Sequence, residues 1–155
     1  MNDIYDSLKD TYEHITKVRK YGTKVLLDWI YRLDVHDQSK TEEPEKSMYD
    51  EFTPTLKTLE YGTEEYNQTK VKMGEALQHH YEVNRHHPEY YEDSLDGMSL
   101  LDMLEMLTDW KAASERMKSG TGDLKKSIEI NAEYFHMDEK IKLLLLNTAS
   151  YLEWI

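Results

Sequence analysis

Histidines and carboxylates gather in two short segments of this 155-residue chain, in a pattern that suits divalent metals. The segment "VHDQSK" places His36 beside Asp37, with Lys40 three residues further on. The segment "HHYEVNRHHP" carries four histidines within nine residues, at positions 79, 80, 86 and 87. Imidazoles and carboxylates are suitable ligands for zinc, manganese and iron, and with more oxygen for magnesium. These segments therefore predict a metal-binding site of undetermined metal identity.

Helical spacing indicates which of these side chains face inward. Steps of four and three residues define one helix face, and such a face carries Met73, Leu77, His80, Asn84 and His87. If Leu77 faces the core, His80 does as well. Asp109 lies at the edge of an apolar stripe on a later helix, four residues from Glu105, and a carboxylate there is costly to bury without a cation or donor.

The elements that must position these residues are predicted to be helices throughout. Apolar residues recur at three- and four-residue steps and no alternating pattern occurs, so we expect an all-α, single-domain helical bundle over residues 1–155. Gly22 is expected to bend or break the first helical segment, and the three prolines are expected to mark breaks. Further helices are predicted at about 63–84, from about 100 behind a Ser99–Asp102 cap, and at about 123–134 and 138–152.

Composition limits the partners of this protein. The formal net charge is -12 and no long Lys/Arg run occurs, which argues against long nucleic acid and anionic membranes as partners. A small anionic substrate would need local positive charge, which a bound metal supplies. The chain has no cysteine, its first ten residues do not resemble a signal peptide, and its longest aliphatic run, "LLLL", is too short to span a membrane. We expect a cytoplasmic protein.

His14, the His36–Asp37 pair and Asp109, taken in order on helical sequence, resemble the metal-binding pattern of the HD-domain superfamily. That pattern has a histidine on one helix, a His-Asp pair at the end of the next, and an aspartate on a later helix. "VHDQSK" and "LTDWKAA" resemble the superfamily's local segments, and the resemblance covers residues about 14–113, leaving the helices of about 123–152 outside it. "HDxSK", "NRHHPE" and "DWKAA" also resemble a sparsely characterised phage and bacterial family, which implies no chemistry.

The HD-domain resemblance implies a metal-dependent phosphohydrolase acting on a nucleotide or cyclic nucleotide. It implies a metal held by His14, His36, Asp37 and Asp109, and a second ion with His80 and His87 as ligands, since two-metal branches add histidines in that region. Lys40 is then a candidate to neutralise the phosphate, and Glu105 a candidate general acid. Further candidates for supporting or substrate contacts are His79, Arg85 and His86.

Other interpretations stay open at this point. An HD-type di-iron oxygenase would use the same ligand types, and a non-catalytic nucleotide-binding or protein-interaction module would need no chemistry. His14 and Asp109 are also compatible with ordinary surface positions. His36 and Asp37 are compatible with a helix end that pairs a histidine with a local acid. Which histidine of each His-His pair is a ligand is left open by the sequence.

Overall fold

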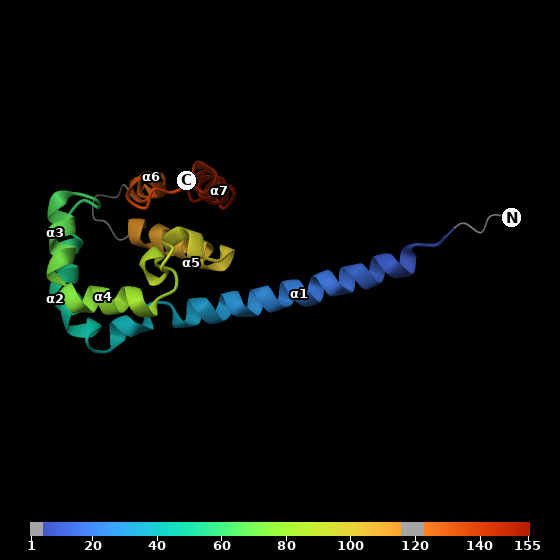
Figure 1. The fold of residues 1–155 in the computed structure, drawn as a ribbon, viewed down its shortest axis with the longest axis horizontal. Helices are drawn as coiled ribbons and strands as arrows, with labels where there is room; N and C mark the ends of the chain where they lie inside the picture. The colour runs from blue at the N-terminus through green and yellow to red at the C-terminus, as the bar shows by residue number, and fades with distance from the viewer. Residues whose placement is uncertain (1–4, 116–122) are drawn as a thin grey trace. The chain divides into compact units, whose positions relative to one another are not determined.

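The first helical segment forms one continuous helix in the computed structural model, α1 (Leu8–Val35), which runs through Gly22 without a break (Figure 1). The expectation that Gly22 breaks this segment is therefore wrong. Gly22 has ordinary helical geometry, with no positive φ, and a glycine inside a helix costs only about 1 kcal/mol relative to alanine. His14 consequently lies on the same helix that ends just before His36, rather than on a preceding one.

The chain divides into two compact units, Met1–His36 and Asp37–Ile155, and the structure describes residues 5–115 and 123–155. The C-terminal unit holds the remaining α-helices: α2 (Glu45–Leu56), α3 (Glu64–Lys72), α4 (Gly74–Val83), α5 (Leu100–Glu115), α6 (Leu124–Tyr134) and α7 (Glu139–Tyr151). It also holds three short 3-10 helices: η1 (Gln38–Thr41), η2 (Pro88–Tyr90) and η3 (Ser94–Gly97). No strand occurs in the described ranges, so the all-α prediction is confirmed. The prediction of a single domain stays a prediction.

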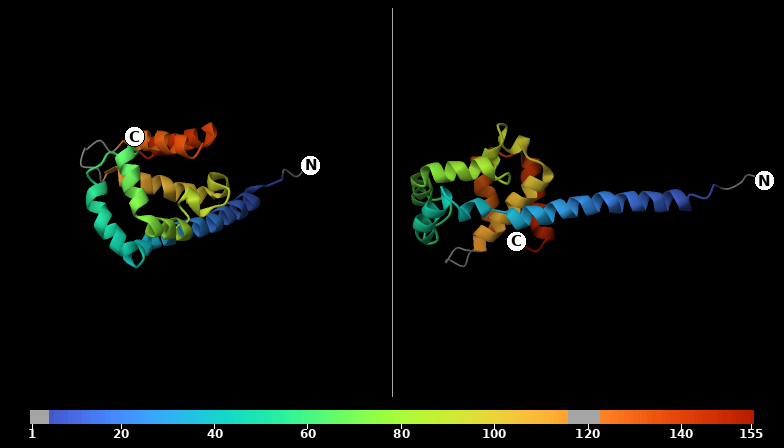
Figure 2. Two further views of the ribbon diagram at one scale, coloured as in Figure 1. Left: turned by 60° about the vertical axis from the view of Figure 1, so that its left-hand side comes forward. Right: turned by 90° about the horizontal axis from the view of Figure 1, so that it is seen from below.

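The hydrophobic core of the C-terminal unit lies among η3, α5, α6 and α7 (Figure 2). Leu107, Leu124 and Ile128 are fully buried there. α5 packs against α6, and α6 packs against α7. A second group of contacts joins η1, α2, α3, α4 and η2. The histidine-rich segment belongs to this second group, since α4 carries His79 and His80 and the turn that follows carries His86 and His87.

Two predicted helix starts are confirmed by their side-chain caps. The Thr63 hydroxyl accepts a hydrogen bond from the Tyr66 backbone N–H at the start of α3. Ser99 and Asp102 form a reciprocal pair: the Asp102 backbone N–H donates to Ser99 Oγ at 3.3 Å, and the Ser99 backbone N–H donates to Asp102 Oδ2 at 2.8 Å. These bonds satisfy backbone donors that a helix start leaves without intrahelical partners.

Two expectations about breaks are corrected by the structure. The sequence predicts one helix over about 63–84, but the chain forms α3 and α4, which are separated at Met73, directly before Gly74. Gly74 has φ 50, a left-handed conformation that glycine adopts without a Cβ penalty. Pro54, expected to mark a break, lies inside α2. Only two helical residues follow it, so the missing N–H disturbs little more than the last turn.

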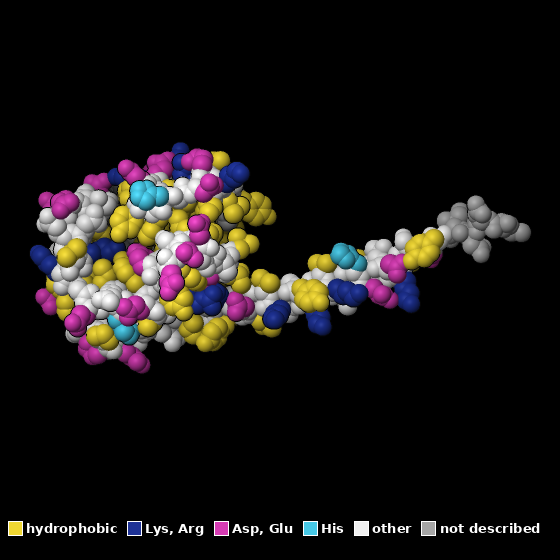
Figure 3. All heavy atoms as spheres, in the orientation of Figure 1, with side chains coloured by type: hydrophobic (Ala, Val, Ile, Leu, Met, Phe, Trp, Pro, Cys, Tyr) yellow, Lys and Arg dark blue, Asp and Glu magenta, His cyan; other side chains and the backbone are white. Residues whose placement is uncertain are grey.

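Charged side chains lie along the whole of α1, between its apolar residues (Figure 3). α1 is the longest helix in the described part of the chain, with 28 residues, and none of them is buried. Across residues 5–115 and 123–155, no helix combines the length and the apolar character needed to cross a membrane.

Candidate metal centre

Four side chains of the C-terminal unit converge at one point. Asp37, His80, His86 and His87 each present one ligand-type atom, and these four atoms all lie within 4.8 Å of one another. Three imidazole nitrogens and one carboxylate oxygen form a donor set that suits a divalent transition metal. The structure thus shows a group of buried and half-buried side chains that could hold a metal ion.

Local geometry explains how residues from separate segments meet. Asp37 adopts a left-handed conformation with φ 56 and precedes η1. His80 lies on the inner face of α4, on the same side as the buried Met73. α4 ends at Val83, with Asn84 as its C-terminal cap, and the chain then turns so that His86 and His87 reach back toward α4. His87 is extended, as expected for a residue that precedes a proline.

The Nε2 atoms of the imidazoles point into the group. His80 Nε2 lies 2.8 Å from His87 Nε2. Asp37 Oδ1 lies 3.5 Å from the Nε2 atoms of both His80 and His86. The rings pack closely, with centroid distances of 4.7 Å between His80 and His87 and 4.2 Å between His86 and His87. The one carboxylate oxygen and the three imidazoles therefore share a small volume.

Lys40 is the neighbour of the other Asp37 oxygen. Its Nζ donates to Asp37 Oδ2, and it lies over the ring of Tyr49, 4.9 Å from the centroid. This ion pair occupies Oδ2 and leaves Oδ1 directed at His80 and His86. The predicted phosphate-facing lysine is thus placed beside the group, and it orients the carboxylate that the group contains.

Glu45 is a site residue that the sequence did not indicate. It is the first residue of α2, is fully buried, and lies with Oε1 2.7 Å from His79 Nδ1 and Oε2 2.9 Å from His80 Nδ1. An acidic residue that follows a proline in the first turn of a helix is typically exposed to solvent, where it interacts favourably with the helix dipole. No pattern in "EEPEKS" signals burial, so only tertiary contacts reveal its role.

Two carboxylates of α5 also reach this region. Glu105 is buried, and its Oε1 lies 3.3 Å from His86 Nδ1. Asp109, one helical turn later, is half-buried, and a carboxylate oxygen of it lies within 4.8 Å of one from Asp37. The structure therefore brings both predicted α5 residues to the neighbourhood of Asp37 and His86.

Burial keeps two of the imidazoles neutral. It lowers the pKa of His80 from its ordinary value to about 4, and the nearby Lys40 charge acts in the same direction. Burial also lowers the pKa of His87 to about 2, assisted by His86 and His80. Neutral imidazoles are the form that binds metals, so the site holds these ligands ready at neutral pH.

None of the remaining predicted residues belongs to the group of Asp37, His80, His86 and His87. His14 and His36 belong to the N-terminal unit, with His14 in α1 and His36 as its C-terminal cap. At 1.5 Å per residue, 22 positions along one helix separate them by about 33 Å, so one α1 does not bring these two imidazoles to the same ion. Arg85 binds Asp102 through Nη2 at 3.4 Å. His79 is 40% exposed and contacts Glu45.

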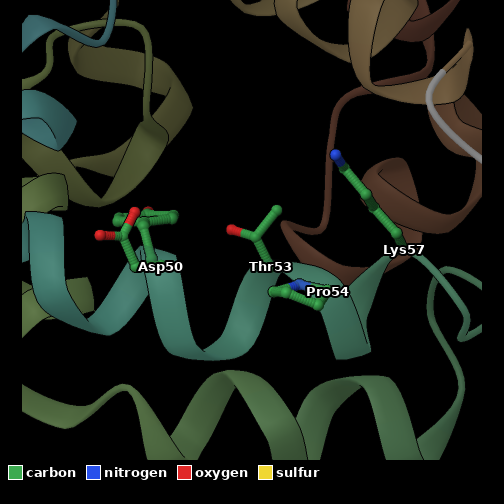
Figure 4. A pocket seen from close by; sticks show the side chains of 5 residues that line it. Asp50, Thr53, Pro54 and Lys57 are labelled. Atoms are coloured by element: carbon green, nitrogen blue, oxygen red, sulfur yellow. The ribbon is translucent and has the colours of Figure 1, made fainter.

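A hollow of about 520 Å³ lies along α2 next to the group (Figure 4). Tyr49 lines this hollow, and its ring meets the His80 ring edge-on at a centroid distance of 5.8 Å. Asp50, Thr53 and Lys57 extend from the same side of α2. Tyr49 therefore contacts both the hollow and His80, and Lys57 gives the hollow a cationic group.

The fold and this group of side chains define an all-helical protein with a candidate metal centre. The chain belongs to the family described as Family of unknown function (DUF5662), whose model matches residues 3–153. Comparisons with curated proteins and with solved structures gave no match.

Proposed function

We propose that this protein is a metal-dependent phosphohydrolase that acts on a nucleotide or a cyclic nucleotide. The convergence of Asp37, His80, His86 and His87 carries the metal-dependent part of this proposal. The likeness of "VHDQSK" and "LTDWKAA" to segments of the HD-domain superfamily supports the phosphohydrolase part. The continuous α1 departs from the order of helices in that superfamily, so this second support rests on the local segments.

The donor set favours a transition metal. Manganese, iron and zinc accept imidazole nitrogen readily, whereas magnesium prefers oxygen ligands and retains several waters. Of the ions suited to imidazole and carboxylate ligands, magnesium therefore fits three histidines and one aspartate least well. A divalent ion held here would act as a Lewis acid that activates water for attack on phosphorus.

The surrounding residues have distinct tasks in this proposal. Lys40 holds Asp37 in place and gives positive charge to a chain whose net charge of -12 repels anions in general. Glu105 is the proposed general acid, which gives a proton to the leaving oxygen; its burial beside His86 supports this role. Asp109 is proposed as a further ligand near Asp37. His14 and His36 stay predictions.

The test begins with elemental analysis of protein purified without chelator and without an affinity metal. Phosphate release is then measured on a panel of nucleotides and cyclic nucleotides with added manganese, iron or zinc. His80→Ala is compared with His136→Asn, a control outside the ligand group at a left-handed position that asparagine tolerates. Metal-dependent phosphate release that His80→Ala abolishes and His136→Asn retains supports the proposal.

Other results would contradict it in identifiable ways. Tightly bound iron with oxygen consumption and no phosphate release would favour a di-iron oxygenase, because the same imidazole-rich ligands suit non-haem iron. A protein that binds no metal on titration would remove both enzyme proposals. The helical scaffold would then be a nucleotide-binding or protein-interaction module.

A further inference from the structure

Glu45 contacts two consecutive histidines from a position without solvent exposure. Its Oε2 lies 2.9 Å from His80 Nδ1, and its Oε1 lies 2.7 Å from His79 Nδ1. We propose that Glu45 is a positioning residue of the metal centre, which holds His80 as the Nδ1–H tautomer and so presents the lone pair of Nε2 to the ion. This inference rests on the metal-binding part of the proposed function and names the group that prepares its central ligand.

The tautomer follows from counting donors around His80 Nδ1. A carboxylate only accepts, so an Nδ1 that faces Glu45 Oε2 must donate. Asn84 Nδ2 also lies 3.0 Å from this nitrogen, but its two hydrogens have other acceptors. One bonds to the His80 carbonyl oxygen at 2.8 Å and the other to Ser39 Oγ at 2.9 Å. The Ser39 hydroxyl lies 3.4 Å from Nδ1, farther than Glu45 Oε2, and a hydroxyl oxygen can itself accept a hydrogen bond. The Nδ1 of His80 therefore carries the hydrogen.

The other ring nitrogen is then fixed as an acceptor. A neutral imidazole carries one N–H, so His80 Nε2 has a lone pair. This atom faces His87 Nε2 at 2.8 Å and Asp37 Oδ1 at 3.5 Å, which is the interior of the ligand group. Metal-ligating histidines characteristically donate their second N–H to a carboxylate, which fixes ring orientation and raises ligand basicity.

His79 explains how Glu45 remains a buried carboxylate. A buried charge is costly unless it is paired and hydrogen-bonded. Each oxygen of Glu45 accepts from one imidazole, with His79 on Oε1 and His80 on Oε2. The two consecutive histidines thus have different roles. His80 faces the ligand group, whereas His79, which is outside that group, donates the second hydrogen bond to Glu45.

The test combines cobalt binding with imidazole NMR. Co²⁺ alone is titrated into metal-free protein and its visible absorption is followed. Long-range ¹H–¹⁵N spectra report which ring nitrogen of His80 carries the hydrogen. Glu45→Gln presents an amide that can donate to Nδ1, which favours the Nε2–H tautomer. We expect this variant to bind Co²⁺ about 10–100-fold more weakly. Glu51→Gln, an exposed change on the same helix, should leave affinity and tautomer unchanged.

Several outcomes would overturn the inference. An Nε2–H tautomer in the metal-free wild-type protein would contradict it without any variant. Unchanged cobalt affinity in a folded Glu45→Gln protein would do the same. If Glu45→Gln does not fold, Glu45→Asp is tested in its place. This variant keeps a carboxylate, but its shorter side chain moves the carboxylate away from His79 and His80. We expect the aspartate variant to bind Co²⁺ more weakly than the wild type, so that it reaches the same occupancy only at a higher Co²⁺ concentration; wild-type affinity in this variant would contradict the positioning role.

The inference and the proposed function can fail separately. Normal cobalt binding with the Nδ1–H tautomer, but no phosphate release from any nucleotide, would refute the phosphohydrolase and leave the role of Glu45 standing. Cobalt binding that does not depend on Glu45 would refute the positioning role and leave the phosphohydrolase standing. No cobalt binding by the wild-type protein would refute both.

Discussion

Acidification should destabilise the metal-free protein at a pH where most carboxylates are still ionised. His80 is neutral in the folded state because burial lowers its pKa to about 4 from its ordinary value of 6.5. Between about pH 6.5 and 4, His80 is therefore protonated in the unfolded chain but not in the folded one. The free energy of unfolding consequently falls as the pH drops through this range. Above about pH 6.5 this contribution is fully present.

The magnitude follows from the two pKa values. One pKa unit corresponds to about 1.4 kcal/mol, so His80 alone lowers the free energy of unfolding by about 2 kcal/mol between pH 7 and pH 5. Its loss approaches about 3 kcal/mol near pH 4. His87, whose pKa burial lowers to about 2, acts in the same direction. Because the two rings touch through their Nε2 atoms, their contributions need not add.

Urea unfolding of chelator-treated protein at about pH 7, 6 and 5 measures this effect. His80→Gln removes the titrating group, so its stability should change with pH by about 2 kcal/mol less than that of the wild type over this range. His14→Gln, on α1, is the matched control and should keep the wild-type slope. A wild-type stability that stays flat from pH 7 to 5 would refute the reasoning. So would a His80→Gln protein that loses as much stability as the wild type.

Three further outcomes are expected. Ser99→Ala removes the side-chain cap of α5 and should cost about 1 kcal/mol in urea unfolding; an unchanged midpoint would contradict the capping role. Leu107→Ala empties a fully buried position and should cost about 2–5 kcal/mol, whereas Leu100→Ala, at a site 69% exposed, should cost far less; equal losses would place the core elsewhere. Zinc at about 100 times its Kd should raise the free energy of unfolding by about 2.7 kcal/mol, and His87→Ala should reduce that gain.

Local signals predicted much of the helical fold because they act between residues a few positions apart. The Ser99–Asp102 pair lies where the sequence predicts it, and the Thr63 cap lies at the predicted start of the helix over about 63–84. The two C-terminal helices begin and end within one residue of their predicted bounds. Gly22 and Gly74 show where this approach fails. Both interrupt an apolar helical pattern, yet Gly22 stays helical and Gly74 turns the chain, because a cost of about 1 kcal/mol is small enough for the surrounding structure to decide.

The candidate ligands, like the helices, were predictable from the sequence only where local patterns act. Residue type indicated a metal site in the segments that carry Asp37 and the four histidines, and helical periodicity indicated that His80 faces inward. The resemblance assigned Asp37 to one ion and His80 with His87 to a second, whereas the structure brings these three residues into one group. The separation of His14 from His36 could not be predicted while Gly22 was taken as a break. The addition of His86 to the group also required the turn after α4, where periodicity no longer applies.

The sequence by itself determined an all-helical chain, several of its helix ends, and a concentration of imidazoles and carboxylates suited to a divalent ion. These properties follow from composition and from contacts within one or two helical turns. The tertiary structure alone decided that His86 joins the ligand group and that Glu45, without solvent exposure, contacts His80 from outside that group. Glu45 and His80 are 35 positions apart, and the packing that brings them together is a property of the whole C-terminal unit.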